Sequence, residues 1–534
     1  MRVAAGRFVT IWTVATLLMV PAFASGHIIS DNSFSNVNWS QGFAQELFSG
    51  HLYPRWLPAM NEGAGSPVFY FYGPLPFYLT APFHLIAGPR FAVLLGMWLM
   101  LGLSGQSFCA LAANFVRSTA ALTASAAYMA MPYHLLVDVW LRSDFGELAA
   151  YIFIPLCLLG AFRLAAEPAW TFGLAASLAG LLLSHLPTAL LFAPFLAGIC
   201  IYIAWQGNFA TVMVRAATAA CLGLGLAAAY IVPAILLQGL IHASNWEIYR
   251  PTDNLLFNGR AGGFDYFLDF SAVETVTVAT IFAVGSFATD RKRQTPWTIL
   301  AVVTFFLTSP AATYMWNAAP AVFDKIQFPW RVLSLLDIAT CMLFALTLEA
   351  KIWRQAVVVR LMLYGLIAVT TLFAVYQSRD PAHGFARRSA EVEDYLITAR
   401  VEPLEYIPSC LMLRKSEKLI RIADSIVKRS ISQKVPDELG VFYYPFLAVY
   451  IDGKRAPTRC NPATGFIDIG PHHGNIDVVI HSTHEEQVGN DLTLTSLLIF
   501  LAGAISSSRT RLLRLFTKMR NAALSGSRNV LKER

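Results

Sequence analysis

The chain has 534 residues, of which 56% are hydrophobic and only 14% are charged, and its mean hydropathy is +0.52. This composition excludes an ordinary soluble protein of such length and predicts an all-α polytopic membrane protein. The net charge of +7 would suit a nucleic-acid partner, but the basic residues lie at the ends of hydrophobic runs and in the C-terminal tail. Basic residues so placed orient helices in a bilayer, so we expect no nucleic-acid partner.

The first 25 residues combine Arg2 and Arg7 with an apolar run and an Ala22-Phe23-Ala24 ending. This pattern fits either a cleaved signal peptide or an uncleaved first span. We prefer the uncleaved span, because many further spans follow and the next loop needs a tether. In both cases the residues after Gly26 begin outside the cytoplasm.

Apolar segments that could cross a hydrocarbon layer of about 30 Å recur along the chain, and about twelve of them are predicted. They lie near Phe8–Ala24, Phe91–Phe115, Ala120–Leu136, Leu148–Leu164, Thr171–Leu183, Pro187–Trp205, Ala216–Ile241, Ser271–Ala288, Trp297–Trp316, Val332–Leu348, Val357–Tyr376 and Leu492–Ile505. The basic residues between them test this topology. Arg117, Arg163 and Arg215 all fall on the same predicted side as Arg2. Because cytoplasmic loops carry the excess of Lys and Arg, both termini are expected in the cytoplasm.

Three parts of the chain follow from this topology. The transmembrane domain covers 1–376 and has a large first outer loop at 25–90. An extracytoplasmic domain covers 377–491, and 492–534 hold the last transmembrane helix and a basic cytoplasmic tail. Within the first loop, Pro74–Ile86 is apolar but short and interrupted by prolines, so we expect a helix that lies along the membrane rather than through it.

The region 377–491 changes character along its length. A helix is expected near Glu391–Ala399, and the later part is β-sandwich-like from about residue 440. Asp452-Gly453 is typical of a hairpin turn. Cys410 and Cys460 could form a disulfide if the region faces an oxidising compartment, and the sequence leaves this pairing open.

Polar side chains that could carry chemistry gather at the outer ends of the predicted spans. Asp31 follows the first span directly, and it is either a general base for a hydroxyl acceptor or an N-cap of a surface helix. Arg142, Asp144 and Glu147 lie between the third and fourth spans, where burial without partners would be costly. They form either a functional site or an internal salt bridge. His185, between two apolar segments, either caps the preceding helix or contacts a lipid phosphate.

Two further segments carry candidate binding residues. Lys325 and Arg331 bracket Gln327, Pro329 and Trp330 at the outer entrance to a span. Trp330 could be an ordinary interfacial anchor, or the two cations could together hold a phosphate. In the first outer loop, Arg55 and Trp56 stand in an aromatic stretch whose rings could stack on a sugar or anchor the loop at the interface.

The first outer loop also carries a family resemblance. Tyr53–Pro58, Asn61–Pro67 and Phe71–Tyr78 resemble that loop in a family of bacterial polytopic membrane proteins labelled 6-pyruvoyl-tetrahydropterin synthase-related, and Arg142 and Gln327–Arg331 are also similar to its patterns. Nothing in the sequence suggests pterin chemistry. The architecture resembles the GT-C superfamily of integral membrane glycosyltransferases and the YfhO-like membrane proteins, which end in a β-domain and a last span.

This resemblance implies a GT-C-like fold in a bacterial inner membrane. It implies transfer of a sugar from a polyprenyl-phosphate donor to a glycan, lipid or protein acceptor on the extracytoplasmic face. Asp31 would be the general base, with Asp144 or Glu147 as a second catalytic acid. His185 stands where aminoarabinose-type relatives have a Lys-Gly-Pro turn that meets the donor phosphate, which is a departure from their pattern. No metal ligands are predicted, although a divalent cation is possible because some GT-C members use one.

The residues expected to bind substrate are basic, amide or aromatic side chains on the outer side: Arg55, Trp56, Arg142, His185, Gln327 and Arg331. Two other classes of function stay open. The chain could be a non-catalytic membrane partner in cell-envelope glycan assembly or export. A secondary transporter is less favoured, because ionisable residues gather at span ends, with Asp337 the nearest exception, and the two halves show no repeat.

Overall fold

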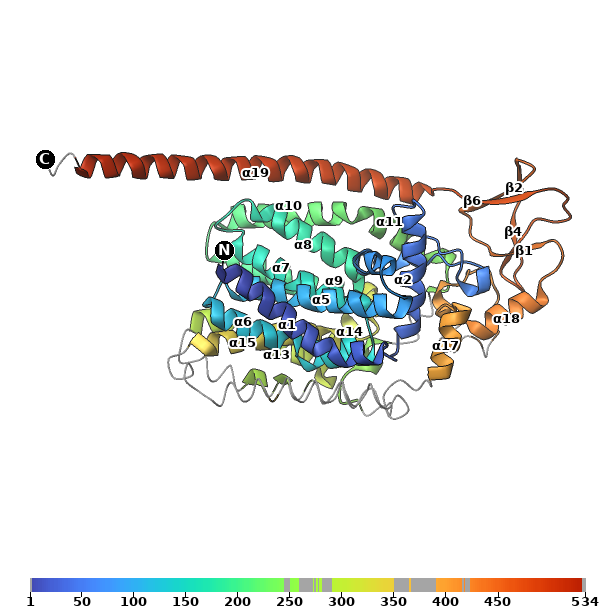
Figure 1. The fold of residues 1–534 in the computed structure, drawn as a ribbon, viewed down its shortest axis with the longest axis horizontal. Coiled ribbons are helices and arrows are strands. Elements are labelled where there is room, and N and C mark those ends of the chain that lie inside the picture. The colour runs from blue at the N-terminus through green and yellow to red at the C-terminus, as the bar shows by residue number, and fades with distance from the viewer. Residues whose placement is uncertain are drawn as a thin grey trace.

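The helices of the computed structural model run side by side in one bundle, with a small β region beyond one end and a long C-terminal helix along one side (Figure 1). The structure describes residues 2–243, 250–258, 291–349, 390–414 and 423–530, together with a few single positions between these ranges. The side chains are described from residue 5 to residue 507 within those ranges. The start of the chain lies toward the end of the bundle opposite the β region, and the C-terminal helix extends past that same end (Figure 1).

Seven of the described helices are long and apolar enough to cross a membrane. They are Ala5–Ser25 within α1 (Arg2–Ser25), α5 (Pro89–Ala112), α7 (Phe145–Arg163), α9 (Leu186–Trp205), α10 (Phe209–Leu226), Pro329–Glu349 formed by η9 (Pro329–Val332) and α15 (Leu333–Glu349), and His484–Ser507 within α19 (His484–Val530). An eighth span is reached if α13 (Arg291–Thr308) is joined to the helical stretch that ends with α14 (Thr313–Ala318), across a bend of 81°.

The described residues therefore contain seven or eight possible spans, fewer than the twelve that the sequence predicts. The predicted span Ala120–Leu136 is broken, because α6 (Ser118–Met129) ends just before Pro132 and the chain continues as the π-helical segment η3 (Pro132–Leu141). The span predicted at Thr171–Leu183 is the 15-residue helix α8 (Trp170–Ser184).

Two further differences concern the later predicted spans. The span predicted at Ala216–Ile241 is two helices, since α10 ends at Leu226 and α11 (Ala228–Leu236) follows after a break. Nearly all of the span predicted at Val357–Tyr376 and most of the one at Ser271–Ala288 lie outside the described residues.

The first outer loop folds into short helices packed against one end of the bundle. It contains α2 (Ser33–Phe48), η1 (Asn61–Gly63), α3 (Val68–Phe71), α4 (Leu75–Thr80) and η2 (Ala81–Leu85). The segment expected to lie along the membrane, Pro74–Ile86, forms α4 and η2, which are too short to span. Most of α2 is buried, including its polar Asn36 and Asn38, so this helix is an internal element rather than a surface one.

The C-terminal polar region begins with two helices, α17 (Ala390–Ala399) and α18 (Asp424–Gln433), with η10 (Leu404–Tyr406) between them. The expected helix near Glu391–Ala399 is thus confirmed. Six strands follow, in two three-stranded antiparallel sheets of order β1-β5-β4 and β3-β2-β6. Their bounds are β1 (Glu438–Phe442), β2 (Leu447–Ile451), β3 (Lys454–Ala456), β4 (Arg459–Cys460), β5 (Phe466–Asp468) and β6 (Ile476–Ile480).

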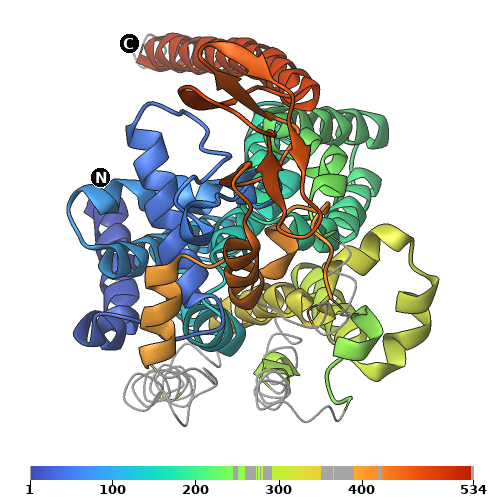
Figure 2. The ribbon, with the colours of Figure 1, turned by 90° about the vertical axis from the view of Figure 1, so that its right-hand side faces the viewer.

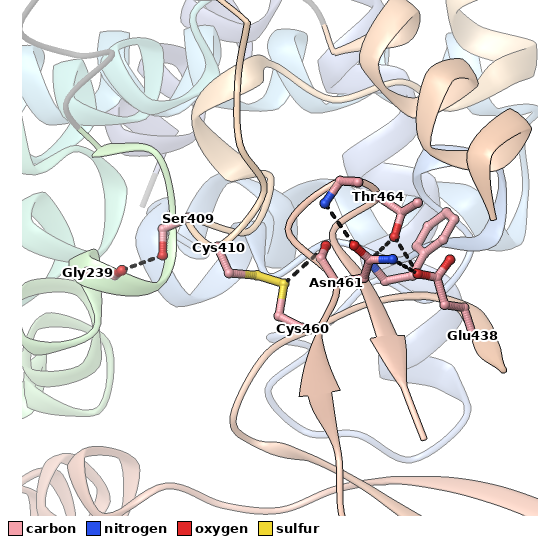
Figure 3. Close-up of a disulfide and its surroundings, with 9 residues drawn as sticks. Gly239, Ser409, Cys410, Glu438, Cys460, Asn461 and Thr464 are labelled. Carbon is pink, nitrogen blue, oxygen red and sulfur yellow. Dashed lines mark hydrogen bonds between the residues drawn. A yellow bond between two sulfur atoms is a disulfide. The ribbon is translucent and has the colours of Figure 1, made fainter. Parts of the chain in front are cut away.

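In this region the predicted hairpin turn is confirmed, and the cysteine pairing that the sequence leaves open is present. Asp452 and Gly453 both have positive φ and connect β2 to β3 as a hairpin turn. Cys410 and Cys460 form a disulfide, which joins the loop after η10 to β4 (Figure 3). Next to it, the Ser409 hydroxyl donates to the Gly239 carbonyl oxygen over 2.7 Å, which ties the same loop to the end of the bundle (Figure 3).

Candidate functional site

Charged side chains gather at the junction between η3 and α7. Arg142 Nη1 lies 3.2 Å from Asp138 Oδ1 and 2.7 Å from Glu147 Oε2, and Arg142 Nη2 lies 2.5 Å from Asp144 Oδ2. Arg331, from η9, approaches the same Glu147 carboxylate, with Nε 3.6 Å from Oε2. We refer to these five residues as the Arg142 cluster. All five are buried, so the acids and bases that the sequence placed in separate loops form one desolvated site.

Local backbone geometry explains how the acids converge on Arg142. Asp144 is the N-cap of α7, and its Oδ1 accepts the Glu147 backbone N–H over 3.0 Å. Ser143, between Arg142 and Asp144, has a φ of +50°, a region that a residue with a side chain rarely adopts. This turn lets Arg142 point back toward the carboxylates on both sides of it.

Arg331 is held by a strained turn. Gln327 has φ +63° and ψ −46°, and the Phe328 N–H donates to the Ile326 carbonyl oxygen over 2.6 Å, which makes Gln327 the centre of a γ-turn of the rarer, strained kind. The Ile326 carbonyl oxygen also accepts a hydrogen bond from Arg331 Nη1 over 2.7 Å. Gln327 therefore contributes through its backbone to the placement of Arg331, in addition to any role of its side chain.

The first outer loop is hydrogen-bonded to residues 141–143, which we call the Arg142 segment. The Asp31 N–H donates to the Leu141 carbonyl oxygen over 3.1 Å, and the Asn32 N–H donates to the Arg142 carbonyl oxygen over 3.0 Å. From inside α2, Asn36 Nδ2 donates to the Ser143 carbonyl oxygen over 2.6 Å. Asp31 itself is exposed, so its carboxylate stands at the solvent boundary of the buried cluster.

His185 closes another side of the site. Its Nδ1 lies 2.7 Å from Thr188 Oγ1. A Cβ added to Gly146 would lie 2.8 Å from His185 Cδ2, which shows how closely the start of α7 packs on this turn. Burial lowers the pKa of His185 to about 3, although the nearby Asp144 carboxylate acts in the opposite direction. His185 is therefore uncharged near neutral pH and can offer a phosphate only a neutral hydrogen bond.

Asp144 has the opposite electrostatic balance. Its burial raises the pKa, but the guanidinium groups of Arg142 and Arg331 lower it more, and the net pKa lies well below the usual range. Asp144 is therefore ionised at neutral pH. Because it is already paired with Arg142 and caps α7, it is held in place as a permanent negative charge.

Arg55 and Trp56 do not join the Arg142 cluster. Arg55 Nε lies 2.9 Å from Glu486 Oε1 at the start of α19, and both side chains are buried. The Trp56 ring packs edge-on against Tyr444, with ring centroids 5.6 Å apart. Both residues therefore connect the first outer loop to the C-terminal region, which lies over the same end of the bundle (Figure 2). In this arrangement neither residue presents an open surface to a sugar.

Sequence reasoning missed three residues of the site. The Tyr133 hydroxyl donates to Glu147 Oε1 over 2.8 Å, and Asp138 bonds to Arg142 from inside η3. Deeper in the bundle, the Tyr151 hydroxyl donates to Asp337 Oδ2 over 3.0 Å. Asp138 precedes Arg142 by four residues, a spacing that places two side chains on the same face of a helix. That spacing was the available signal for Asp138.

The carboxylates of the Arg142 cluster do not fit a divalent cation. Each of the three is paired with Arg142, and among the described residues no group of three or more His, Cys, Asp and Glu side chains is arranged to hold a metal ion. Comparison with protein-family models and with curated proteins gives no match for this chain.

Proposed function

We propose that this chain is an integral membrane glycosyltransferase, which moves a sugar from a polyprenyl-phosphate donor to an acceptor on the extracytoplasmic face of a bacterial inner membrane. One observation supports this more than any other. The exposed Asp31 is joined through backbone hydrogen bonds to the segment that carries a buried cluster of arginines and acids. A base at the water boundary beside fixed charges is the arrangement that such a transfer needs.

In this mechanism Asp31 removes the proton from an acceptor hydroxyl as its oxygen attacks the anomeric carbon of the sugar. The bond between that carbon and the phosphate oxygen breaks, and the polyprenyl phosphate leaves with the electron pair. The added negative charge develops on the phosphate, where a guanidinium can stabilise it. The proton stays on Asp31 until solvent removes it.

Arg331 is better suited than Arg142 to meet the leaving phosphate. Arg142 has close ion pairs to three carboxylates. Arg331 Nε lies 3.6 Å from Glu147 Oε2, beyond hydrogen-bond distance. This Nε–H group is buried and has no hydrogen-bond partner among the described residues. Turning this edge of Arg331 toward a phosphate would break fewer contacts. Arg142 would then serve to hold Asp144 and Glu147 in position.

The sidedness of the site is part of the proposal. The Cys410–Cys460 disulfide supports an oxidising compartment for the C-terminal polar region. That region contacts the first outer loop, because the Phe442 N–H donates to the Ala64 carbonyl oxygen over 2.8 Å. Both would then be extracytoplasmic, with the two ends of the chain in the cytoplasm.

The decisive test uses purified wild-type protein and Asp31→Asn with a panel of polyprenyl-phosphate sugars and a mixture of glycan and lipid acceptors. Release of free polyprenyl phosphate is measured. Glu62→Gln, which changes an exposed acid in the same loop, is the matched control. We expect release from wild type and from Glu62→Gln, and a loss of at least a hundredfold in Asp31→Asn, within the range that general base catalysis contributes.

Two other outcomes would contradict the proposal. Equal release from all three proteins would remove Asp31 from the mechanism. No release from folded wild type with any donor would favour a non-catalytic partner in envelope glycan assembly, in which the Arg142 cluster only holds the first loop in place.

A further inference from the structure

The Arg142 cluster contains an excess of negative charge. Asp138, Asp144 and Glu147 supply three carboxylates, whereas Arg142 and Arg331 supply two guanidinium groups, and all five are buried. An uncompensated charge in such a place is so unfavourable that a buried acid normally takes up a proton instead. The geometry indicates which of the three acids does so.

Asp144 and Glu147 are well provided with donors. Asp144 bonds to Arg142 Nη2 and caps α7. Glu147 receives Arg142 Nη1 at 2.7 Å and the Tyr133 hydroxyl at 2.8 Å. Asp138 has only Arg142 Nη1, at the longer distance of 3.2 Å, and must share it with Glu147. Its second oxygen, Oδ2, is fully buried and has no hydrogen-bond partner among the described residues.

We propose that Asp138 is a proton-binding site, which holds one proton at neutral pH and makes the buried cluster electrically neutral. The groups that face it come from η3, α7 and η9: Tyr133, Arg142, Asp144, Glu147, Tyr151 and Arg331. Because Asp144 and Glu147 keep their negative charges, they balance the two arginines. The proposal does not depend on the glycosyltransferase activity, since it follows from the charges and contacts alone.

Substitution by the isosteric neutral amide tests this directly. Asp138→Asn replaces a neutral acid by a neutral amide, so we expect the variant to fold and to unfold on heating at pH 7 within about 2 °C of wild type, a shift below about 1 kcal/mol for a chain of this size. Asp144→Asn is the matched control. It removes the negative charge that pairs with Arg142, and we expect the midpoint of thermal unfolding to fall by several degrees.

Infrared spectroscopy gives the second readout. The carbonyl band of a protonated carboxylic acid, which shifts in D₂O, should lose the intensity of one acid group in Asp138→Asn and keep it in Asp144→Asn. Both variants are compared in a background that also carries Glu402→Gln and Asp337→Asn, so that these two other buried acids do not contribute to the band. Persistence of the full band in Asp138→Asn would overturn the proposal. So would failure of that variant to fold, or a loss of stability as large as that of Asp144→Asn.

Discussion

Glu402 makes the junction between the first outer loop and the C-terminal region sensitive to pH. Its carboxylate is buried, and Oε2 accepts a hydrogen bond from Trp39 Nε1 over 2.9 Å. The backbone N–H of Glu402 donates to Asn61 Oδ1 over 3.2 Å, so the residue lies between the two regions. Burial raises the pKa of Glu402 to about 8, although hydrogen bonds from Ser66 and Trp39 lower it in part.

The size of the effect follows from that pKa. The pKa rises from 4.5 to about 8 on folding, and each unit corresponds to about 1.4 kcal/mol. Because the folded state holds the proton more tightly than the unfolded state, the contribution of Glu402 to stability is fully present below pH 4.5. It is lost progressively as the pH rises to about 8, and the total loss is about 5 kcal/mol.

Glu402→Gln should remove this dependence. The amide oxygen can still accept from Trp39, so the variant should be about as stable as wild type at pH 5 and more stable at pH 8.5. Tryptophan fluorescence during heating of the detergent-solubilised protein, from pH 5 to pH 8.5, measures the difference. Glu391→Gln, an exposed acid in α17, serves as control and should follow wild type. An unchanged pH slope in Glu402→Gln would refute the reasoning, as would a large loss of stability at pH 5.

Three further predictions concern other parts of the structure. Cys410→Ser should cost about 4 kcal/mol for a loop of 50 residues, measured by denaturant unfolding, and added reductant should destabilise wild type but not this variant. Arg331→Lys keeps the charge but loses the planar fork that bonds to Ile326, so donor turnover should fall about tenfold or more, a change of about 1.4 kcal/mol. Gly65→Ala should destabilise by about 2 kcal/mol or more in the same unfolding assay, because its Cβ would overlap the Trp56 ring at a φ of +84°.

Local patterns in the sequence predicted the parts of the site that lie close together in the chain. Arg142, Asp144 and Glu147 lie within six residues of one another, and this spacing predicts either a functional site or an internal salt bridge. The structure contains the salt bridge. A buried ion-pair cluster at a membrane boundary can also be a functional site.

Long-range partners could not be predicted in this way. Arg55 was expected to bind substrate, but it pairs with Glu486, which lies more than four hundred residues later in the chain. Trp56 packs against Tyr444 for the same reason: the C-terminal region folds back over the first loop. The spacing of residues within one segment does not predict a contact with a segment hundreds of residues away. An aromatic and basic stretch therefore looks the same in sequence whether its partner is a sugar or another part of the chain.

The number of spans was overestimated for a different physical reason. Hydropathy measures whether a segment is apolar, but not whether its helix is continuous. Pro132 interrupts one apolar segment, which then continues as η3 and carries Asp138 into the Arg142 cluster. The same break that makes the predicted span wrong thus helps to build the site, since a π-helical segment is frequently found where side chains must be placed for function.

The connection between Asp31 and the cluster bears on how the proposed function can be tested. Asp31 and Asn32 reach the Arg142 segment through backbone N–H groups, and Asn36 reaches it through a side chain. Asp31→Asn leaves all three hydrogen bonds available, so it changes the charge at the boundary without releasing the loop. Asn36→Ala does the reverse, because it frees the strained turn at Ser143 while keeping the carboxylate. A glycosyltransferase should lose turnover in both variants, whereas only Asn36→Ala should lower the thermal stability of the protein.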